Sequence, residues 1–205
     1  SFTIQSAFSF PENYHNMLSA QWVNDTNIVF AAEKASLPPP YTTEDRGIGV
    51  MLLNPEDTII SQAYIGDADT VDFPAFRESI VVRNPQTIYI GGTKNVYMTI
   101  WSTNKSWYIL SKLDEQMNVV WTKYYGGDAY YNLWTIKETQ DGGCLMLGTR
   151  YDYLTQKERD IYIVRVDENG LITSTNEMPP LTVSEAIVYP NPGSTQLTIE
   201  TALKD

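Results

Sequence analysis

The pattern that decides the fold is NIVFAAEK at residues 27–34, which returns as TIYIGGTK at residues 87–94 and as GCLMLGTR at residues 143–150. Each copy is a short run of apolar, small and β-branched residues that ends on Lys or Arg. Such a run is typical of a buried β-strand. Because a pattern that recurs at a nearly constant spacing indicates a repeat architecture, we expect three copies of one structural unit.

Further strand-like runs surround each copy. One lies upstream: LSAQWV from residue 18, SIVVR from residue 79 and WTIKET from residue 134. One lies downstream and ends in a turn: VMLLNPED from residue 50, LSKLDEQMN from residue 110 and IVRVDENG from residue 163. Asn54, Asp114 and Asp167 share one turn position, where we expect the side chain to accept backbone N–H groups. A last run, DTIISQAYIGD or NVVWTKYYGGD, closes the first two copies.

The unit is therefore four strands in about 50 to 60 residues joined by tight turns, which is the pattern of a β-propeller blade. We predict an all-β protein with blades at residues 8–67, 68–128 and 129–177, and residues 1–7 as the last strand of a preceding blade. A β-sandwich with similar strands is the alternative. Since propeller rings close with about 4 to 8 blades, we expect a fragment of a larger propeller, or a ring closed by the first strand or by a second chain.

Composition excludes several classes of protein. The chain has 25 acidic and 14 basic residues and a net charge of −11, a field of the wrong sign for binding nucleic acid through phosphates. Its single cysteine, Cys144, excludes a disulfide framework and a cysteine-based zinc site, and its apolar strand predicts a core position. No apolar run approaches the roughly 20 residues of a transmembrane helix.

The composition changes after the third repeat. Residues 178–185 read as a linker, and residues 186–205 as the start of a second domain. In that domain two strand-like runs, at 186–189 and 196–200, flank a Pro-Asn-Pro-Gly turn at residues 190–193. Prolines fix φ and glycine permits a left-handed backbone, so a hairpin is expected here.

The segment Tyr189, Pro190, Asn191 and Pro192, followed by the short strand at residues 197–199, resembles the start of the type A C-terminal sorting domain of type IX secretion in Bacteroidota. Runs such as WTKYYGG from residue 121 and VDENG from residue 166 resemble propeller repeats that precede such domains. The resemblance implies a small β-sandwich at the C-terminus, the type IX machinery as a partner, and a secreted or surface-attached protein whose signal peptide lies upstream or has been removed. It also makes Thr58 and Thr70, in Asp-Thr-Ile and Asp-Thr-Val, candidate O-glycosylation sites.

Catalytic signatures are weak. His15 is the only histidine and no G-x-S-x-G motif is present, which argues against a hydrolytic triad. Carboxylates in a central channel would suit a glycosidase, but their spacing singles out none. Asp67, Asp69 and Asp72 read as a solvated acidic loop, with calcium binding as the alternative, and no other cofactor is indicated.

The connections differ in length between the two ends of the predicted blades. Long connections and the stretches between blades fall at one end, where binding sites usually form. Aromatic residues gather in or beside them, and we predict ligand binding by Tyr97, Trp101, Trp107, Tyr130, Tyr131, Tyr151 and Tyr153. Trp121 and Trp134, inside strands, are expected to pack between blades.

Two classes of function follow from the sequence. The first, which we favour, is a secreted or cell-surface module without catalytic activity that binds a glycan or a surface protein, as in adhesion. The second is a glycan-degrading hydrolase or lyase, or an accessory domain of one. Fold alone does not separate them, because propellers host both binding and catalysis.

Overall fold

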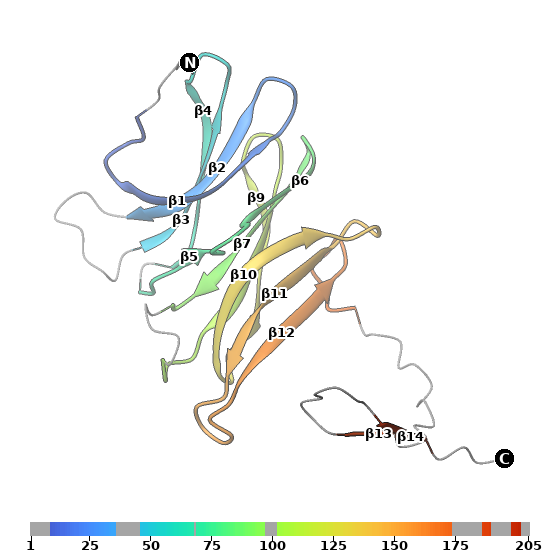
Figure 1. The fold of residues 1–205 in the computed structure, drawn as a ribbon. Coiled ribbons are helices and arrows are strands. Elements are labelled where there is room, and N and C mark those ends of the chain that lie inside the picture. Colours follow the sequence, from blue (N-terminus) through green and yellow to red (C-terminus); the bar gives the residue numbers. More distant parts are fainter. Residues whose placement is uncertain are drawn as a thin grey trace, which may run out of the picture. The chain divides into compact units, whose positions relative to one another are not determined.

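The computed structural model describes residues 9–35, 46–67, 69–96, 102–173, 186–189 and 198–201. The regular elements in these ranges are all β-strands, which form antiparallel sheets that follow one another along the chain (Figure 1). The chain divides into two compact units, Ser1–Ile172 and Thr173–Asp205, and each is described by itself. The predicted all-β fold of repeated, blade-like sheets is confirmed.

The first sheet consists of β1 (Tyr14–Trp22), β2 (Ile28–Ala35), β3 (Arg46–Leu53) and β4 (Ile59–Ile65), in the order β1-β2-β3-β4. All three pairings are antiparallel, so the sheet is a meander in which each strand lies beside the next one in sequence. These strands coincide with the four runs of the first repeat. The period-two alternation of side chains gives this sheet two apolar faces.

The second sheet contains β5 (Phe73–Pro74), β6 (Ile80–Asn84), β7 (Thr87–Lys94), β8 (Trp107–Leu113) and β9 (Val119–Gly126). β7, β8 and β9 pair in sequence order, whereas β5 and β6 both pair with β7, one near each of its ends. The first strand of this repeat is therefore broken in two, which the sequence pattern did not predict.

The break follows from a proline and from contacts with the third sheet. Pro74 has no backbone N–H with which to continue the ladder. The two halves stay joined to β7 at Gly91, whose C=O accepts from the N–H of Ala75 at 3.0 Å and whose N–H donates to the C=O of Ser79 at 2.8 Å. The intervening backbone bonds elsewhere: Glu78 C=O accepts from the N–H of Ile136, in the third sheet, at 3.0 Å.

The third sheet has the order β10 (Tyr130–Glu138), β11 (Cys144–Tyr151) and β12 (Arg159–Val166), with antiparallel pairing throughout. After β12 the chain turns back, and Ile172 forms one antiparallel bridge with Val166. The repeat pattern predicts a fourth strand at this position, and within the described residues this bridge is the part of it that is formed.

The same side-chain-closed turn follows the third strand of each repeat. Asp114 Oδ1 accepts hydrogen bonds from the N–H of Gln116 at 2.9 Å and of Asn118 at 2.8 Å. Asn54 and Asp167 make the equivalent pairs of bonds. The predicted turn-capping role of this position is confirmed.

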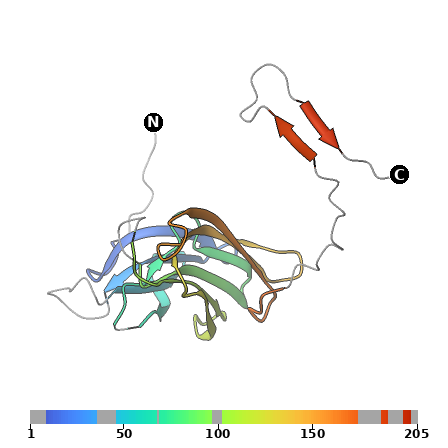
Figure 2. The same ribbon diagram turned by 90° about the horizontal axis from the view of Figure 1, so that it is seen from below.

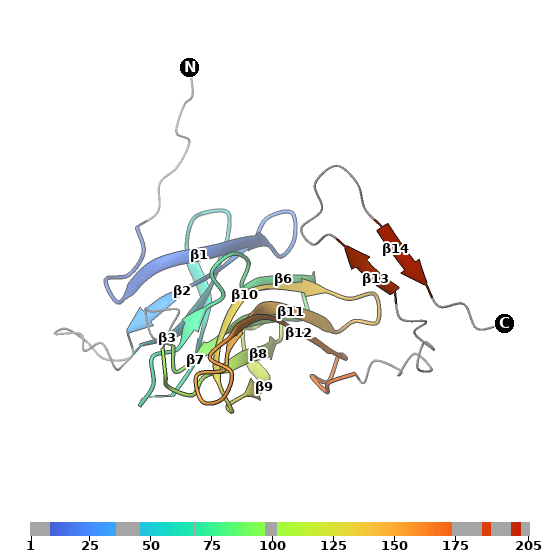
Figure 3. The same cartoon turned by 60° about the horizontal axis from the view of Figure 1, so that its bottom comes forward.

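The three sheets pack face to face in chain order, as the views in Figures 2 and 3 show. We call the face of a sheet that meets the following sheet its trailing face, and the opposite face its leading face. In the third sheet the trailing face is the one turned away from the second sheet. The trailing face of the first sheet meets the leading face of the second through an aliphatic cluster that includes Val29, Ile48, Val50, Ile88, Ile90 and Ile109. This arrangement fits stacked blades and not the two-sheet sandwich.

The second interface is richer in aromatic and polar groups. Trailing-face residues Tyr89, Tyr108 and Leu110 pack against leading-face residues of the third sheet, among them Ile136, Cys144, Met146, Val164 and Val166. Cys144 is fully buried, and burial raises the pKa of its thiol to about 12. Trp121 packs against this cluster as predicted, whereas Trp134 is 38% exposed, so its predicted packing role is wrong.

The second unit contains β13 (Ala186–Tyr189) and β14 (Thr198–Thr201), which pair as an antiparallel hairpin with Ala186 opposite Thr201. The two strands match the predicted runs. Pro190, Asn191 and Pro192, the predicted linker and the first seven residues lie outside the described residues.

Candidate ligand-binding site at the loop end

The topology brings the long connections to one end of the sheets, here called the loop end. At this end β2, β7 and β11 finish, and β3, β8 and β12 begin. The links from β4 to β5 and from β9 to β10 also lie here, because alternate connections of an antiparallel meander emerge at the same end. The opposite end carries the tight turns, as predicted.

The structure divides the predicted aromatic residues into two groups. Tyr130 and Tyr131 are each only 2% exposed, so the expectation that they face a ligand is wrong. Trp107, Tyr151 and Tyr153 are partly exposed at the loop end. Tyr97 and Trp101 lie outside the described residues.

Contacts with the second sheet and within the third sheet explain why Tyr130 and Tyr131 are buried. Tyr131 packs edge-on against Tyr108 and Tyr162, with ring centroids 5.7 and 5.1 Å away. Tyr130 lies in a small apolar cluster with Phe73 and Val96 of the second sheet. A strand pattern reports which residues alternate, but it does not report which face another sheet covers.

Tyr151 and Tyr153 form the most accessible aromatic pair among the predicted residues that the structure describes. Their ring centroids are 6.4 Å apart with an interplanar angle of 53°. Both pack against the cluster that contains Phe73, Val96 and Tyr130, and both stay partly exposed. Rings held in this way are suited to stack on an apolar ligand surface.

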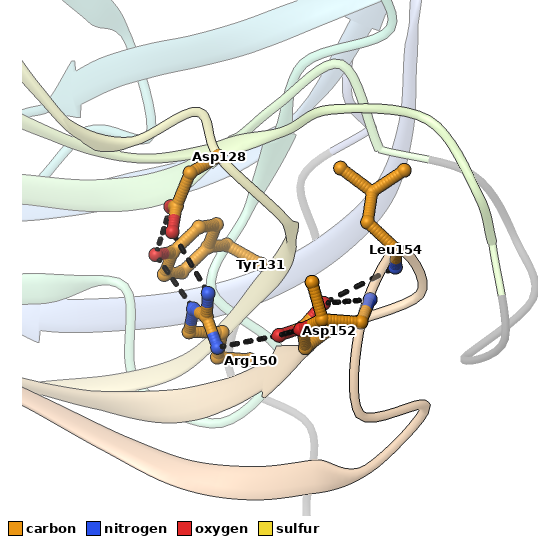
Figure 4. Close-up of polar contacts among 6 residues, drawn as sticks. Asp128, Tyr131, Arg150, Asp152 and Leu154 are labelled. Atoms are coloured by element: carbon orange, nitrogen blue, oxygen red, sulfur yellow. Dashed lines mark hydrogen bonds and ion pairs between the residues drawn. The ribbon is translucent and has the colours of Figure 1, made fainter.

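A polar cluster lies on the same segment (Figure 4). The Arg150 guanidinium donates to Asp128 Oδ2 at 2.8 Å and, through Nε, to the Tyr131 hydroxyl at 3.1 Å. That hydroxyl donates to Asp128 Oδ1 at 2.5 Å. Arg150 also forms an ion pair with Asp152 at 3.9 Å, and Asp152 Oδ1 accepts the N–H of Leu154 at 3.1 Å. The arginine is thus fixed between two carboxylates.

These contacts set the charge state of the cluster. The hydroxyl of Tyr131, and then Arg150, hold the pKa of Asp128 below its ordinary value. Hydrogen bonds from Thr155 lower the pKa of Asp152. The bond to Asp128 raises the pKa of Arg150, although its partial desolvation opposes this. At neutral pH the cluster therefore contains two ionised carboxylates and one guanidinium.

The second sheet carries an ion pair equivalent to that of Arg150 and Asp128, which the sequence analysis did not predict. Lys94 occupies the same repeat position as Arg150 and pairs with Asp67, which, like Asp128, follows a glycine after the fourth strand of the preceding sheet. Lys94 Nζ also lies 4.8 Å from the ring centroid of Tyr124. The recurrence of Gly-Asp and of Lys or Arg was visible in the sequence, but it gave no sign that the two positions meet.

The prediction of a solvated acidic loop at Asp67, Asp69 and Asp72 is wrong for Asp72, which has a structural role. Asp72 is fully buried and accepts the N–H of Asp67 and of Asn95, both at 3.0 Å, and the hydroxyl of Thr70 at 2.9 Å. Desolvation raises its pKa, against the effect of these bonds. Of the two candidate O-glycosylation sites, Thr70 is half-buried and its hydroxyl donates to Asp72, whereas Thr58 is exposed.

Within the described ranges no group of three His, Cys, Asp or Glu side chains is placed to hold a metal ion. Three acidic residues in those ranges are buried: Glu33, Asp72 and Asp152. Glu33 pairs with Arg46 and accepts from Asn16 at 2.8 Å, so each of the three has partners of its own.

The arrangement favours neutral, hydroxyl-rich ligands. The Asp128 side chain is 63% exposed and retains acceptor capacity for hydroxyl groups, whereas the Arg150 side chain is 23% exposed and already bonded to carboxylates. An anionic ligand would have to displace those carboxylates.

Among the described residues the structure has no helix that is long and apolar enough to cross a membrane. No protein-family model matches the chain, and the search of curated proteins returned no match.

Proposed function

We propose that this protein is a binding module without catalytic activity that recognises neutral glycans at its loop end and acts on the cell surface or after secretion. One observation carries the proposal: Tyr151 and Tyr153, partly exposed and backed by an apolar cluster, follow directly on an arginine fixed between two carboxylates. Aromatic rings that stack, combined with preset polar groups, are the usual means of recognising a sugar.

Charge supports a neutral ligand over an acidic one. The chain has a net charge of −11, and the guanidinium at the site is compensated by Asp128 and Asp152. A sulfated, sialylated or phosphorylated ligand would meet a repulsive field.

The state of the carboxylates supports binding over hydrolysis. A glycosidase needs one carboxyl group with a raised pKa to act as general acid. At the loop-end cluster the pKa values of Asp128 and Asp152 are both lowered. Asp72 has a raised pKa, but it is fully buried and already accepts three hydrogen bonds.

The location is proposed from the C-terminal segment. The resemblance of residues 189–192 to a sorting-domain motif supports export through type IX secretion, and the hairpin β13–β14 is compatible with it. Export is tested by producing the chain behind a signal peptide in Bacteroidota hosts with intact and disrupted type IX machinery. Secretion from the intact host together with retention in the disrupted host would support this part, and equal secretion from both hosts would contradict it.

Binding is tested on immobilised neutral and acidic oligosaccharides, followed by titration of any hit. We expect neutral glycans to bind and Tyr153→Ala to weaken binding about tenfold, which corresponds to about 1.4 kcal/mol for a lost stacking ring. Leu154→Ala is the matched control, since Leu154 is in the same loop and 65% exposed but has no ring. Unchanged affinity in the Tyr153 variant, or a preference for acidic glycans, would overturn the proposal.

A further inference from the structure

The third strand of each repeat reveals an uncovered face. The trailing-face residues Ile48 and Val50 of β3 are fully buried, and so are Tyr108 and Leu110 of β8. The corresponding residues of β12 are Ile161 and Ile163, which are 75% and 54% exposed. The same repeat position is thus closed by a following sheet twice and left open the third time.

The exposed isoleucines belong to a continuous apolar surface. In the register of the third sheet Leu147 lies opposite Ile163, and Leu145 is two residues away on the same face of β11. We call Leu145, Leu147, Ile161 and Ile163 the β11–β12 patch. In the two preceding sheets the equivalent faces form the two largest apolar clusters among the described residues. Large exposed apolar patches are where proteins commonly bind partners.

The charges beside the patch are neutralised within the chain. Lys137 and Arg165 lie on the same face, opposite Leu145 in the register. Lys137 pairs with Glu78, and Arg165 pairs with Asp141 at 2.9 Å. A partner therefore needs no counter-charge, and in a chain of net charge −11 this face opposes the approach of a second copy less than an acidic face would.

The other end of the stack is covered in part by the chain itself. On the leading face of the first sheet Met51 and Leu53 are at most 2% exposed. They lie in a cluster with Tyr14 and with Phe10, which precedes β1 and packs edge-on against Phe30 at 5.4 Å. On this face Met51 and Leu53 are closed off within the chain, although Trp22 in the edge strand β1 is 64% exposed, whereas at the β11–β12 patch the third strand itself is open.

We propose that the β11–β12 patch is a self-association surface, on which a second copy of this chain packs its own patch about a two-fold axis. The occupant is an apolar sheet face, because that is what covers the same repeat positions in the two interfaces within the chain. Pairing of identical patches is preferred to contact with the first sheet, where Met51 and Leu53 are already buried in a cluster with Phe10 and Tyr14. Two-fold dimers are also the commonest closed assemblies.

The test is the solution mass of the full chain by light scattering and sedimentation from micromolar to about 100 µM protein. We expect a dimer that dissociates on dilution, and a monomer for Ile161→Lys/Ile163→Lys at every concentration. Because both side chains are solvent-exposed in the monomer, the variant should keep its β-sheet circular dichroism.

The matched control is Val120→Lys/Leu154→Lys. It adds the same charge at positions that are 58% and 65% exposed but outside the patch, and it should remain a dimer. A wild-type chain that is monomeric throughout would overturn the proposal. So would equal dissociation of the control, which would indicate a charge effect, and so would association beyond two copies, which would indicate head-to-tail contact.

Discussion

At the scale of single residues, buried tyrosines join the second sheet to the third. Three from the second sheet reach across the interface and donate their hydroxyls to backbone carbonyls: Tyr89 to Gly142 at 2.9 Å, Tyr108 to Tyr162 at 3.2 Å and Tyr125 to Gly170 at 2.7 Å. Desolvation is the main cause of their raised pKa values, about 12 for Tyr89. A tyrosine is suited to this position because its ring fills the core and its hydroxyl satisfies a carbonyl.

Removing one of these hydroxyls tests this role. Tyr125→Phe keeps the ring but leaves the carbonyl of Gly170 without its side-chain donor, so we expect the free energy of unfolding to fall by about 1–2 kcal/mol. Urea denaturation followed by fluorescence measures it. Tyr124→Phe is the control, since Tyr124 is 44% exposed, and it should change stability by less than about 0.5 kcal/mol. Equal effects at the two positions would contradict the interpretation.

At the scale of elements, the sequence predicted the strands whose position depends on contacts between residues close together in the chain. Strand positions followed from alternation and recurring turns, because each turn is closed by its own side chain at Asn54, Asp114 or Asp167. The break between β5 and β6 was missed, because besides Pro74 it depends on hydrogen bonds to residues of the third sheet that are distant in sequence. Periodicity contains no information about such contacts.

The turn shared by the three repeats should be stabilised by the side-chain oxygen that accepts the backbone N–H groups, not by its charge. Asp167→Ala removes an acceptor that serves the N–H of Asn169 at 2.9 Å and of Leu171 at 2.8 Å, so we expect a loss of about 1–2 kcal/mol. Asp167→Asn should be nearly neutral, because an asparagine makes the same bonds at residue 54 in the first sheet. Thermal unfolding of both variants checks this. If the asparagine variant were as unstable as the alanine variant, charge and not acceptor geometry would be responsible.

At the scale of the whole molecule, the candidate site arises from the packing of sheets. The sequence predicted the end of the sheets at which it lies, since topology fixes which connections share an end. It did not predict that Tyr130 and Tyr131 would be covered, or that Asp128 and Arg150 would meet. Both outcomes depend on how one sheet lies on the next, and a repeat pattern specifies the sheets without specifying that fit.

Two truncations test where the first unit ends. Cutting after Thr173 keeps all described elements of the first unit, so we expect the free energy of unfolding of the full chain to be retained. Cutting after Asp167 removes the bridge of Ile172 to Val166, the carbonyl of Gly170 that accepts from Tyr125, and the C=O of Leu171 that accepts from Asp167.

The free energy of unfolding of the chain that ends at Asp167 should therefore fall by about 2–3 kcal/mol, the contribution of a few hydrogen bonds. Apolar burial adds little, because Leu171 and Ile172 are 57% and 62% exposed. Denaturant unfolding of the full chain and both truncations gives the comparison, with the full chain as reference. Equal stability of the two truncations would mean that the last turn contributes nothing to the third sheet. A marked loss of stability in the chain that ends at Thr173 would mean that residues after Thr173 stabilise the sheets, contrary to the division into two units.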